Sequence, residues 1–334
     1  MNILVTMPKG EKRDTFLTQI SIPELESLGN VTYNPHDRNY TTEELKEALK
    51  GIDVVFCYWG SASYDEEILA AADSLKVIAY CAGSVAGVAT PAVYEKGIAM
   101  LGANCVFAES VAESCICYTM VGLRRIEHYT NNVRTGLWRE DPFYNEGIMD
   151  RTIGLVGFGA IAKKFVEFLK PYRNKILVYS GHLTDEEAAK YGVQRATLEE
   201  VFAKSDVVSI HQGLNDRTRH MVKREHLDLM KDGSLLVNTA RGAVIDEKEL
   251  IEVLKTGRIN AVLDVFEEEP PAPDAVLRKL KNVTILPHMG GPTIDRRQYC
   301  VTKLVDDIKK LMAGEKLENL ETYIPLSHVT NMTR

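Results

Sequence analysis

Short apolar runs alternate with amphipathic segments along most of the 334-residue chain. In the first hundred residues the apolar runs are NILVT (2–6), DVVFCY (53–58) and KVIAY (76–80). Between them, TTEELKEALK (41–50) has the Thr/Glu pattern of a capping box and the spacing of a helix. Continuously apolar strands separated by helices are typical of a parallel sheet with helices on both faces. The N-terminal region is therefore predicted to form an α/β domain.

The same alternation restarts at residue 151. The apolar runs there are RTIGLVG (151–157), KILVY (175–179), DVVSI (206–210), SLLVNT (234–239), INAVLDV (259–265) and VTILP (283–287). A helical stretch from about 109 to 131 is expected to connect the two regions, and the helical tail 295–313 to return to the first. We predict two Rossmann-like, doubly wound parallel-sheet domains with a cleft between them. Residues 1–104 with 295–334 form a flavodoxin-like substrate-binding domain, and residues 105–294 form a dinucleotide-binding domain.

A glycine-rich turn, GFGAIA (157–162), follows the first strand of the second region and opens a helix. Gly157 allows a tight turn, and Gly159 lets the backbone approach a pyrophosphate at the helix N-terminus. Ala162 stands where the fingerprint has its third glycine. The alternative is an ordinary strand-to-helix turn that needs glycine for its backbone angles. Strand, turn and helix occur in the order that favours cofactor binding. The expected cofactor-binding residues of the turn are Gly157, Gly159, Ala160 and Ile161.

The choice between NAD and NADP depends on the end of the next strand, where an Asp or Glu usually binds the ribose 2′-hydroxyl of NAD. This chain has Ser180, Gly181 and His182 there. Without a carboxylate a 2′-phosphate meets no repulsion, and Ser180 with a protonated His182 could bind it. Alternatively, Ser180 contacts the ribose hydroxyl and His182 is a solvated loop residue. Because no arginine stands here, the prediction of NAD or NADP leans only modestly toward NADP.

Three further segments carry groups suited to reducing a ketone: NTARG (238–242), DVFEEEP (264–270) and LPHMGG (286–291). The planar guanidinium of Arg241 can hold a carboxylate and polarise the neighbouring carbonyl, although a surface arginine is the plainer alternative. His288 follows a strand, where open α/β sheets bind ligands, and with a carboxylate partner it can donate a proton to an oxygen. A structural histidine is the alternative interpretation of His288.

Composition narrows the class of partner and the compartment. The net charge is −7 and no basic run occurs, which argues against nucleic acid or an anionic membrane as the main partner. The N-terminus lacks a charged segment followed by an apolar one, and no apolar run approaches 18 residues, so we expect a cytoplasmic protein. The six cysteines are scattered, and Cys115 and Cys117 point to different helix faces, so no metal is expected.

From the glycine turn to LPHMGG the chain resembles the NAD(P)-binding domain of the D-isomer-specific 2-hydroxyacid dehydrogenases, and the preceding region resembles their substrate domain more loosely. The resemblance implies a homodimer built largely on the dinucleotide domain. It selects Glu269, directly before Pro270, as the partner of His288, where related formate dehydrogenases have glutamine. It also implies that Asp264 and the turn at Ala240 contact the cofactor. Asp264 could instead be a hydrogen-bonded residue at a strand end.

On the substrate side, the resemblance implies that backbone N–H groups of the loop Ala82, Gly83, Ser84 hold the substrate carboxylate. The loop departs from the family pattern after Val85, so the particular donor stays open. Asn104 resembles the family's asparagine ahead of the connecting helix, and Trp59 either walls the pocket or belongs to the core.

The expected function is NAD(P)-dependent reduction of a 2-oxo acid to a D-2-hydroxy acid, with Arg241, Glu269 and His288 as catalytic residues. No Lys or Arg occurs in 51–75 or 81–89, which favours an unphosphorylated acid such as glyoxylate or hydroxypyruvate, or a bulkier one stacking on Trp59. The alternative is a non-catalytic, nucleotide-sensing protein like the family's corepressors. The retained Arg, Glu and His favour the enzyme.

Overall fold

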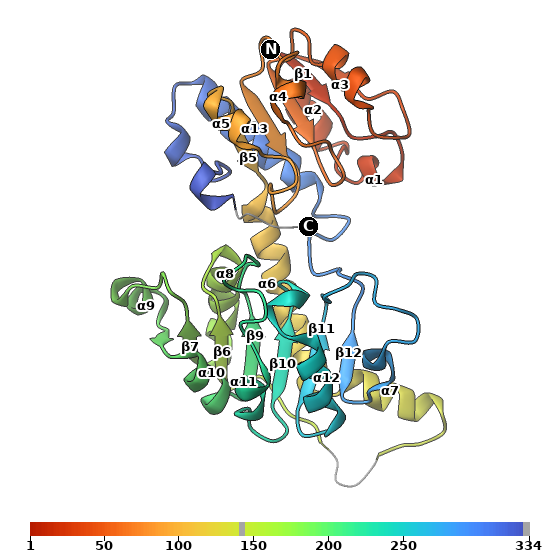
Figure 1. Ribbon diagram of the computed structural model, residues 1–334, viewed down its shortest axis with the longest axis vertical. Coiled ribbons are helices and arrows are strands. Elements are labelled where there is room, and N and C mark those ends of the chain that lie inside the picture. The colour runs from red at the N-terminus through yellow and green to blue at the C-terminus, as the bar shows by residue number, and fades with distance from the viewer. Residues whose placement is uncertain (140–143, 330–334) are drawn as a thin grey trace. The chain divides into compact units, whose positions relative to one another are not determined.

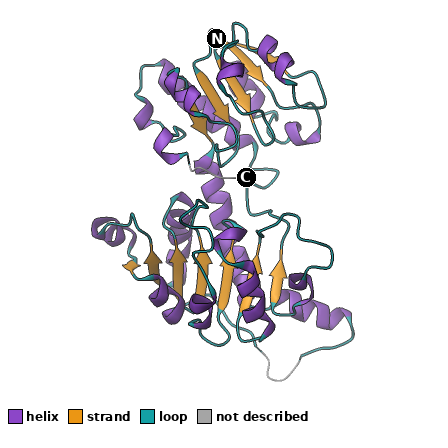
Figure 2. Cartoon of the chain, in the orientation of Figure 1, coloured by secondary structure: helices purple, strands orange, loops and turns teal. Residues whose placement is uncertain are grey.

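The protein was analysed as a computed structural model that describes residues 1–139 and 144–329. It divides into two compact units (Figure 1). The first, here the outer-segment unit, contains Met1–Phe107 and Pro292–Arg334, and the second, here the central unit, contains Ala108–Gly291. Each unit has one parallel sheet with helices on both faces (Figure 2). The prediction of two parallel-sheet α/β units is confirmed.

The outer-segment unit has a five-stranded sheet in the order β2-β1-β3-β4-β5. Its strands are β1 (Asn2–Val5), β2 (Asn30–Tyr33), β3 (Val54–Cys57), β4 (Val77–Tyr80) and β5 (Ala99–Gly102). Its helices are α1 (Glu11–Asp14), α2 (Ser21–Glu26), α3 (Thr42–Ala48), α4 (Glu66–Leu69), α5 (Pro91–Glu95) and α13 (Gln298–Met312), with 3-10 turns η4 (Leu317–Asn319) and η5 (Leu326–His328). The predicted capping box of α3, between Thr41 and Glu44, is present.

Side chains alternate across this sheet, as a pleated strand requires. Ile3 and Val5 pack on one face in a cluster that includes Leu25 of α2 and Leu304 of α13. The residues that alternate with these along the strands point to the opposite face, where they pack against α3, α4 and α5. Both faces of β3 and β4 are therefore buried, which explains why these two strands are continuously apolar.

The free edge of β5 is covered by a segment from near the C-terminus. The Gly102 N–H donates to the Thr322 carbonyl at 2.7 Å, and the Ile324 N–H donates to the Met100 carbonyl at 2.9 Å. Asp307 of α13 is fully buried and holds this segment, since the Thr322 N–H and hydroxyl both donate to its carboxylate at 2.9 Å. The segment thus adds a short antiparallel pairing to an otherwise parallel sheet.

The central unit has a seven-stranded parallel sheet in the order β12-β11-β10-β9-β6-β7-β8. Its strands are β6 (Thr152–Val156), β7 (Lys175–Tyr179), β8 (Gln194–Arg195), β9 (Val207–Ile210), β10 (Leu235–Asn238), β11 (Asn260–Leu263) and β12 (Val283–Ile285). Its helices are α7 (Ile126–Arg134), α8 (Ala160–Leu169), α9 (Asp185–Tyr191), α10 (Leu198–Lys204), α11 (Arg224–Asp228) and α12 (Glu247–Lys255), with 3-10 turns η1 (Lys170–Tyr172), η2 (Gly242–Val244) and η3 (Val276–Lys279). One apolar cluster packs α6 (Asn104–Leu123) and α8 on one face of the sheet, and another packs α10, α11 and α12 on the other.

The connecting helix differs from the expectation of one stretch from 109 to 131. Helix α6 (Asn104–Leu123) begins earlier and contains the boundary between the units, and α7 is a separate helix. The break occurs at Arg125, whose φ of 51° is left-handed. By length and composition α6 could span a bilayer, yet half of that window is buried within the protein. One such helix is weak evidence for a membrane span, since core helices of globular proteins meet the same criteria.

Candidate active site

His288 and Glu269 form a hydrogen-bonded pair in the central unit. His288 lies three residues after β12, and its Nδ1 is 2.6 Å from Glu269 Oε2. The other Glu269 oxygen, Oε1, accepts from the Phe266 N–H at 3.0 Å. Because an ionised carboxylate only accepts, this contact assigns the proton to Nδ1 and leaves Nε2 to exchange a proton with another molecule. The exposed fractions of the two side chains, 48% and 35%, leave the pair accessible.

The three consecutive glutamates have different environments. Glu267 pairs with Nε2 of His220, and the Glu267 N–H donates to the Glu247 carboxylate at 2.9 Å. Glu268 is exposed. Only Glu269 reaches His288 among the described residues. The choice of Glu269 therefore has a geometric basis that a run of three glutamates does not reveal.

Asp264 follows β11 and holds the backbone on which His288 sits. Its two oxygens accept from the Met289 and Gly290 N–H groups, both at 2.8 Å. The side chain is buried, and burial raises the pKa of Asp264 above its ordinary value despite these two donors. Because Asp264 holds the two residues that follow His288, it also fixes the left-handed backbone of His288, whose φ is 52°. Asp264 is thus a hydrogen-bonded residue at a strand end, and its contact with the cofactor stays a prediction.

Arg241 lies at the end of β10, where a close backbone contact sets its position. A Cβ on the next residue, Gly242, would lie 1.9 Å from the Phe266 carbonyl carbon, so only glycine fits. This contact brings the Arg241 turn against the segment that leads to Glu269. Asn238 braces the turn, because its side-chain amide donates to the Arg241 carbonyl at 3.1 Å. Burial lowers the pKa of the Arg241 guanidinium, and Glu269 partly offsets this effect. The group stays cationic, since arginine does not deprotonate in proteins.

The glycine turn lies where the strand order of the sheet reverses. Strand β6 has β7 on one side and β9 on the other, so the loops after β6 and β9 diverge there. Gly157 has φ of 95°, and a Cβ there would lie 2.8 Å from the Gln212 nitrogen. Gly159, at the N-terminus of α8, has no atom within 4 Å of a built Cβ. Ala162 is fully buried against the sheet. A pyrophosphate therefore has open space at a helix N-terminus.

His211 stands beside this turn and was not singled out from the sequence. Its ring is buried, and burial lowers its pKa to about 4, so it is neutral at physiological pH. Nε2 lies 3.0 Å from the Ser209 hydroxyl, whereas Nδ1 has no partner among the described residues. An unpaired buried nitrogen is unusual, and a ligand in the turn is one way to satisfy it.

The residues expected to choose between NAD and NADP lie after β7. Ser180 is half-buried and accepts from the His182 N–H at 3.3 Å, and His182 and Gly181 are exposed. A Cβ at Gly181 would meet nothing within 4 Å. The turn is thus open at Gly181 and contains no carboxylate.

The outer-segment unit holds the expected substrate residues at the carboxyl ends of its strands. Ala82 is buried, Gly83 half-buried and Ser84 exposed, in the loop after β4. Asn104 is the first residue of α6 rather than a residue ahead of it. Its side-chain oxygen is buried without a partner among the described residues, so it can accept a hydrogen bond from a ligand.

Trp59 follows β3 and is only partly buried. Its ring makes edge contacts with Phe16 and Phe107, at centroid distances of 5.5 and 6.0 Å. Lys12 and Arg297 also lie over it, at 5.1 and 5.5 Å. Trp59 therefore belongs to the core on one side and to the surface on another.

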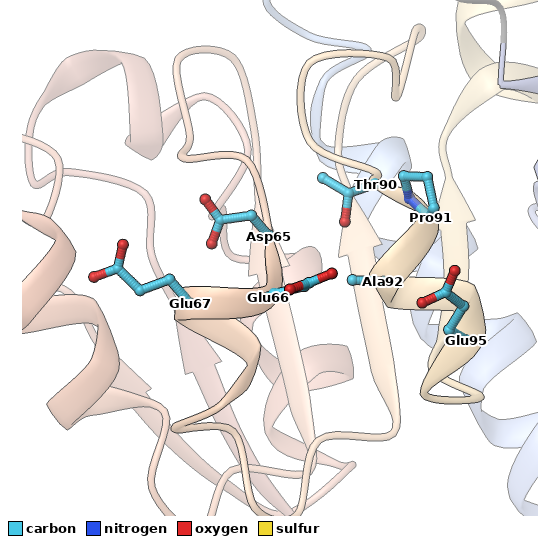
Figure 3. Close-up of a pocket in the computed structure, with 7 residues that line it drawn as sticks. All are labelled: Asp65, Glu66, Glu67, Thr90, Pro91, Ala92 and Glu95. Atoms are coloured by element: carbon cyan, nitrogen blue, oxygen red, sulfur yellow. The ribbon is translucent and has the colours of Figure 1, made fainter.

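A separate hollow in the outer-segment unit contains none of the expected residues (Figure 3). It lies between the starts of α4 and α5 and is lined by Asp65, Glu66, Glu67, Thr90, Pro91, Ala92 and Glu95. Four of these seven side chains are carboxylates, which repel an acid. Asp65 already caps α4 by accepting from the Ile68 N–H. Within 1–139 and 144–329, no three His, Cys, Asp or Glu side chains form a group that could hold a metal ion.

Comparison with known proteins gives consistent matches. Residues 116–290 match the family model described as "D-isomer specific 2-hydroxyacid dehydrogenase, NAD binding domain". A glyoxylate reductase of Thermofilum pendens is 33% identical over 85% of this chain and 86% of its own length. A D-3-phosphoglycerate dehydrogenase of Methanocaldococcus jannaschii is 34% identical over 96% of this chain, which spans 59% of that protein. The crystal structure of a glyoxylate reductase from Paecilomyes thermophila has a TM-score of 0.76 at 25% identity and covers 98% of each chain.

Proposed function

Because the chain belongs to the D-isomer-specific 2-hydroxyacid dehydrogenase family, a family of oxidoreductases, we propose that it reduces a 2-oxo acid to a D-2-hydroxy acid. The observation that carries this proposal is the His288–Glu269 pair, whose free Nε2 suits it to proton transfer. The short approach between Gly242 and Phe266 supports it, because it brings Arg241 to the same side of the sheet as that pair.

The chain's own residues have distinct roles in this proposal. Arg241 binds the substrate carboxylate through its planar fork and polarises the adjacent carbonyl. His288 Nε2 gives its proton to the carbonyl oxygen as that oxygen gains negative charge. Glu269 holds the imidazole in the tautomer with Nδ1–H and stabilises the positive ring before transfer. Asp264 keeps the His288 loop in place, and its remaining lone pairs and the Ala240 turn are proposed to contact the nicotinamide end of the cofactor.

The residues present fit a dinucleotide, because Gly157 and Gly159 leave space at the α8 N-terminus and His211 has an unpaired nitrogen beside it. A bound nicotinamide dinucleotide supplies the hydride that the carbonyl carbon accepts. Ala160 and Ile161, the first residues of α8, are proposed to offer their backbone N–H groups to the pyrophosphate.

For the choice of cofactor, we propose NADP at least alongside NAD. The support is the open space at Ser180 and Gly181 and the lack of a carboxylate in this turn. Ser180→Asp should shift preference toward NADH by about 1 to 3 kcal/mol, or roughly 5- to 150-fold, since it would repel a 2′-phosphate. Fluorescence titration of both cofactors measures this shift. A wild-type protein that binds NADH far more tightly than NADPH would contradict the proposal.

The proposed substrate is an unphosphorylated 2-oxo acid, bound on the outer-segment unit by Ala82, Gly83, Ser84 and Asn104. The absence of Lys and Arg from 51–75 and 81–89 supports this, as do relatives that include glyoxylate reductases. A cytoplasmic homodimer without a nucleic-acid or membrane partner stays part of the proposal. The net charge of −7 supports only the lack of a nucleic-acid or anionic-membrane partner, and the homodimer rests on the family.

The direct test is a panel of 2-oxo acids assayed with NADH and NADPH, with chiral analysis of the product. We expect turnover to a D-hydroxy acid. His288→Ala should lower kcat on the order of 10² to 10⁴ with cofactor affinity nearly unchanged. Wild-type hydride transfer by that variant in stopped-flow would remove His288 from the mechanism. Cofactor binding without turnover on any acid would instead support a nucleotide-sensing protein.

A further inference from the structure

Two cationic side chains from distant parts of the chain gather on Trp59. Lys12 Nζ lies 5.1 Å from the centroid of the Trp59 ring and 5.2 Å from that of Tyr58. The Arg297 guanidinium carbon lies 5.5 Å from the Trp59 centroid. We name Lys12, Trp59 and Arg297 the cation–tryptophan cluster. All three residues belong to the outer-segment unit, so their arrangement is fixed within one compact body.

The cluster occupies the position in the sheet at which ligands generally bind. Strand β1 lies between β2 and β3, so the strand order reverses between β1 and β3. In open α/β sheets, ligands bind at the carboxyl ends of the strands at such a reversal. Lys12 comes from the segment after β1, and Trp59 is the second residue after β3. The two side chains therefore come from the two strand ends at this reversal and contact each other.

Phe107 connects the cluster to the loop proposed to hold the substrate carboxylate. Its ring centroid is 6.0 Å from that of Trp59. On its other side, a Cβ at Gly83 would lie 3.1 Å from Phe107 Cδ1. A substrate bound at Gly83 is therefore separated from the cation–tryptophan cluster by one aromatic side chain, that of Phe107.

The charges of the cluster are not neutralised within the described part of the chain. No carboxylate in 1–139 or 144–329 forms an ion pair with Lys12 or Arg297. The three nearby acids, Glu11, Asp14 and Asp295, line a different hollow with Thr15, Thr18 and Gln298.

Arg297 is nevertheless held in place. Its Nη1 donates to the Thr15 hydroxyl at 3.3 Å and its Nε to the Pro292 carbonyl at 3.4 Å. Since a guanidinium has five N–H donors, three remain available to a ligand. Lys12 and Arg297 both place a positive charge beside the Trp59 ring, and an anionic group bound beside that ring is attracted to both.

We propose that the cation–tryptophan cluster binds a second anionic group at the far end of the substrate. The inference rests on the proposed function and narrows it to a 2-oxo acid with two anionic ends. Arg297 offers a fork to a carboxylate or phosphate, and Lys12 adds a point charge. A bulky apolar substrate stacking on Trp59 is disfavoured, because aromatic and cationic groups already surround its ring. The absence of Lys and Arg from the loops near Trp59 and Gly83 does not exclude such a subsite, because its cations come from elsewhere in the chain.

The test compares kcat/KM for glyoxylate, 2-oxoglutarate, oxaloacetate and 3-phosphohydroxypyruvate in the wild type and three variants. Lys12→Gln removes a charge of the cluster, Lys12→Arg retains it, and Lys76→Gln removes a charge at the amino end of β4, on the opposite edge of the same sheet. We expect the wild type to prefer a dianionic acid. Lys12→Gln should lower kcat/KM for that acid about 10-fold or more and change glyoxylate less than about twofold, since a charged hydrogen bond is lost from one end only. Lys12→Arg should restore the preference and Lys76→Gln should leave it unchanged.

Equal losses on all four acids in Lys12→Gln, or no wild-type preference for a dianion, would overturn the subsite. If the phosphorylated acid is preferred, the subsite stands and the unphosphorylated substrate of the proposed function is wrong. A protein that reduces neither these acids nor any other of the 2-oxo acid panel refutes the proposed function, and the subsite is then tested by calorimetry with unreactive glutarate and butyrate. Lys12-dependent binding of glutarate over butyrate supports the subsite, and equal affinity overturns it.

Discussion

Replacing Glu269 by glutamine isolates the contribution of the carboxylate to proton transfer. Glutamine keeps the shape of the side chain and can still accept from the Phe266 N–H through its oxygen. Its NH₂ group would then face His288 Nδ1, across the 2.6 Å contact that the carboxylate makes. Because two donors cannot share that contact, Nδ1 must lose its proton and act as the acceptor. The doubly protonated, positive ring is then disfavoured, because its Nδ1–H would meet an amide NH₂ in place of a carboxylate.

The cost follows from the hydrogen bond that is lost. A hydrogen bond to a charged group contributes about 1.5 to 3 kcal/mol, which is roughly 10- to 150-fold in rate. Both side chains are partly exposed, 48% for His288 and 35% for Glu269, so water weakens the interaction. We therefore expect kcat to fall about 10- to 50-fold, with the dissociation constant for NADPH unchanged.

The assay is single-turnover oxidation of NADH or NADPH with saturating 2-oxo acid, beside fluorescence titration of the cofactor. Glu268→Gln is the matched control, because it removes the same charge one residue earlier from an exposed side chain. If Glu269→Gln and Glu268→Gln turn over at the same rate as the wild type, Glu269 has no part in proton transfer and the reasoning fails.

Three further predictions follow from the site and its support. Arg241→Lys keeps the charge but loses the fork, so kcat/KM should fall roughly 10- to 150-fold with the melting temperature unchanged; near-normal turnover would place the anchor elsewhere. Gly242→Ala puts a Cβ where backbone lies 1.9 Å away, so thermal unfolding should show a loss of about 1 to 3 kcal/mol together with lower activity. Burial opposes the charge on Asp307, but Lys310 and Thr322 outweigh it and hold its pKa below the ordinary value. Asp307→Asn should therefore cost about 1 to 3 kcal/mol at pH 7, and urea titrations should show this cost disappearing as the pH falls through the lowered native pKa of Asp307. A cost independent of pH would mean that the charge does not matter.

The sequence was most informative where local pattern and burial coincide. Strands β3 and β4 are apolar throughout, and β6 and β10 nearly so, because both faces of these central strands are covered. Strand β2 was not anticipated, since it lies at an edge and its residues alternate between exposed and half-buried. The end of α6 was also missed, because Arg125 takes a left-handed backbone without the Gly or Pro that usually marks a break.

In the candidate site, too, the sequence pattern alone does not identify every important residue. The family motif selected Glu269, but no local pattern separates it from Glu267, whose partner His220 lies 47 positions away. Gly242 and His211 owe their importance to backbone contacts between strand ends, which depend on the order of strands in the sheet. Lys12 and Arg297 meet on Trp59 only because α13 packs back on the first sheet. Such pairings cannot be found from spacing along the chain.

The short pairing of residues 322–324 with β5 has a consequence for the solution behaviour of the protein. An uncovered edge strand presents a row of unpaired backbone donors and acceptors to any other extended chain. Here Thr322 and Ile324 occupy that row on Gly102 and Met100, and Asp307 keeps them there. Asp307, which has no role in the proposed reaction, thus helps to prevent association of two molecules through the β5 edge of the sheet. Loss of Asp307 should therefore appear first as faster aggregation of the concentrated protein during storage.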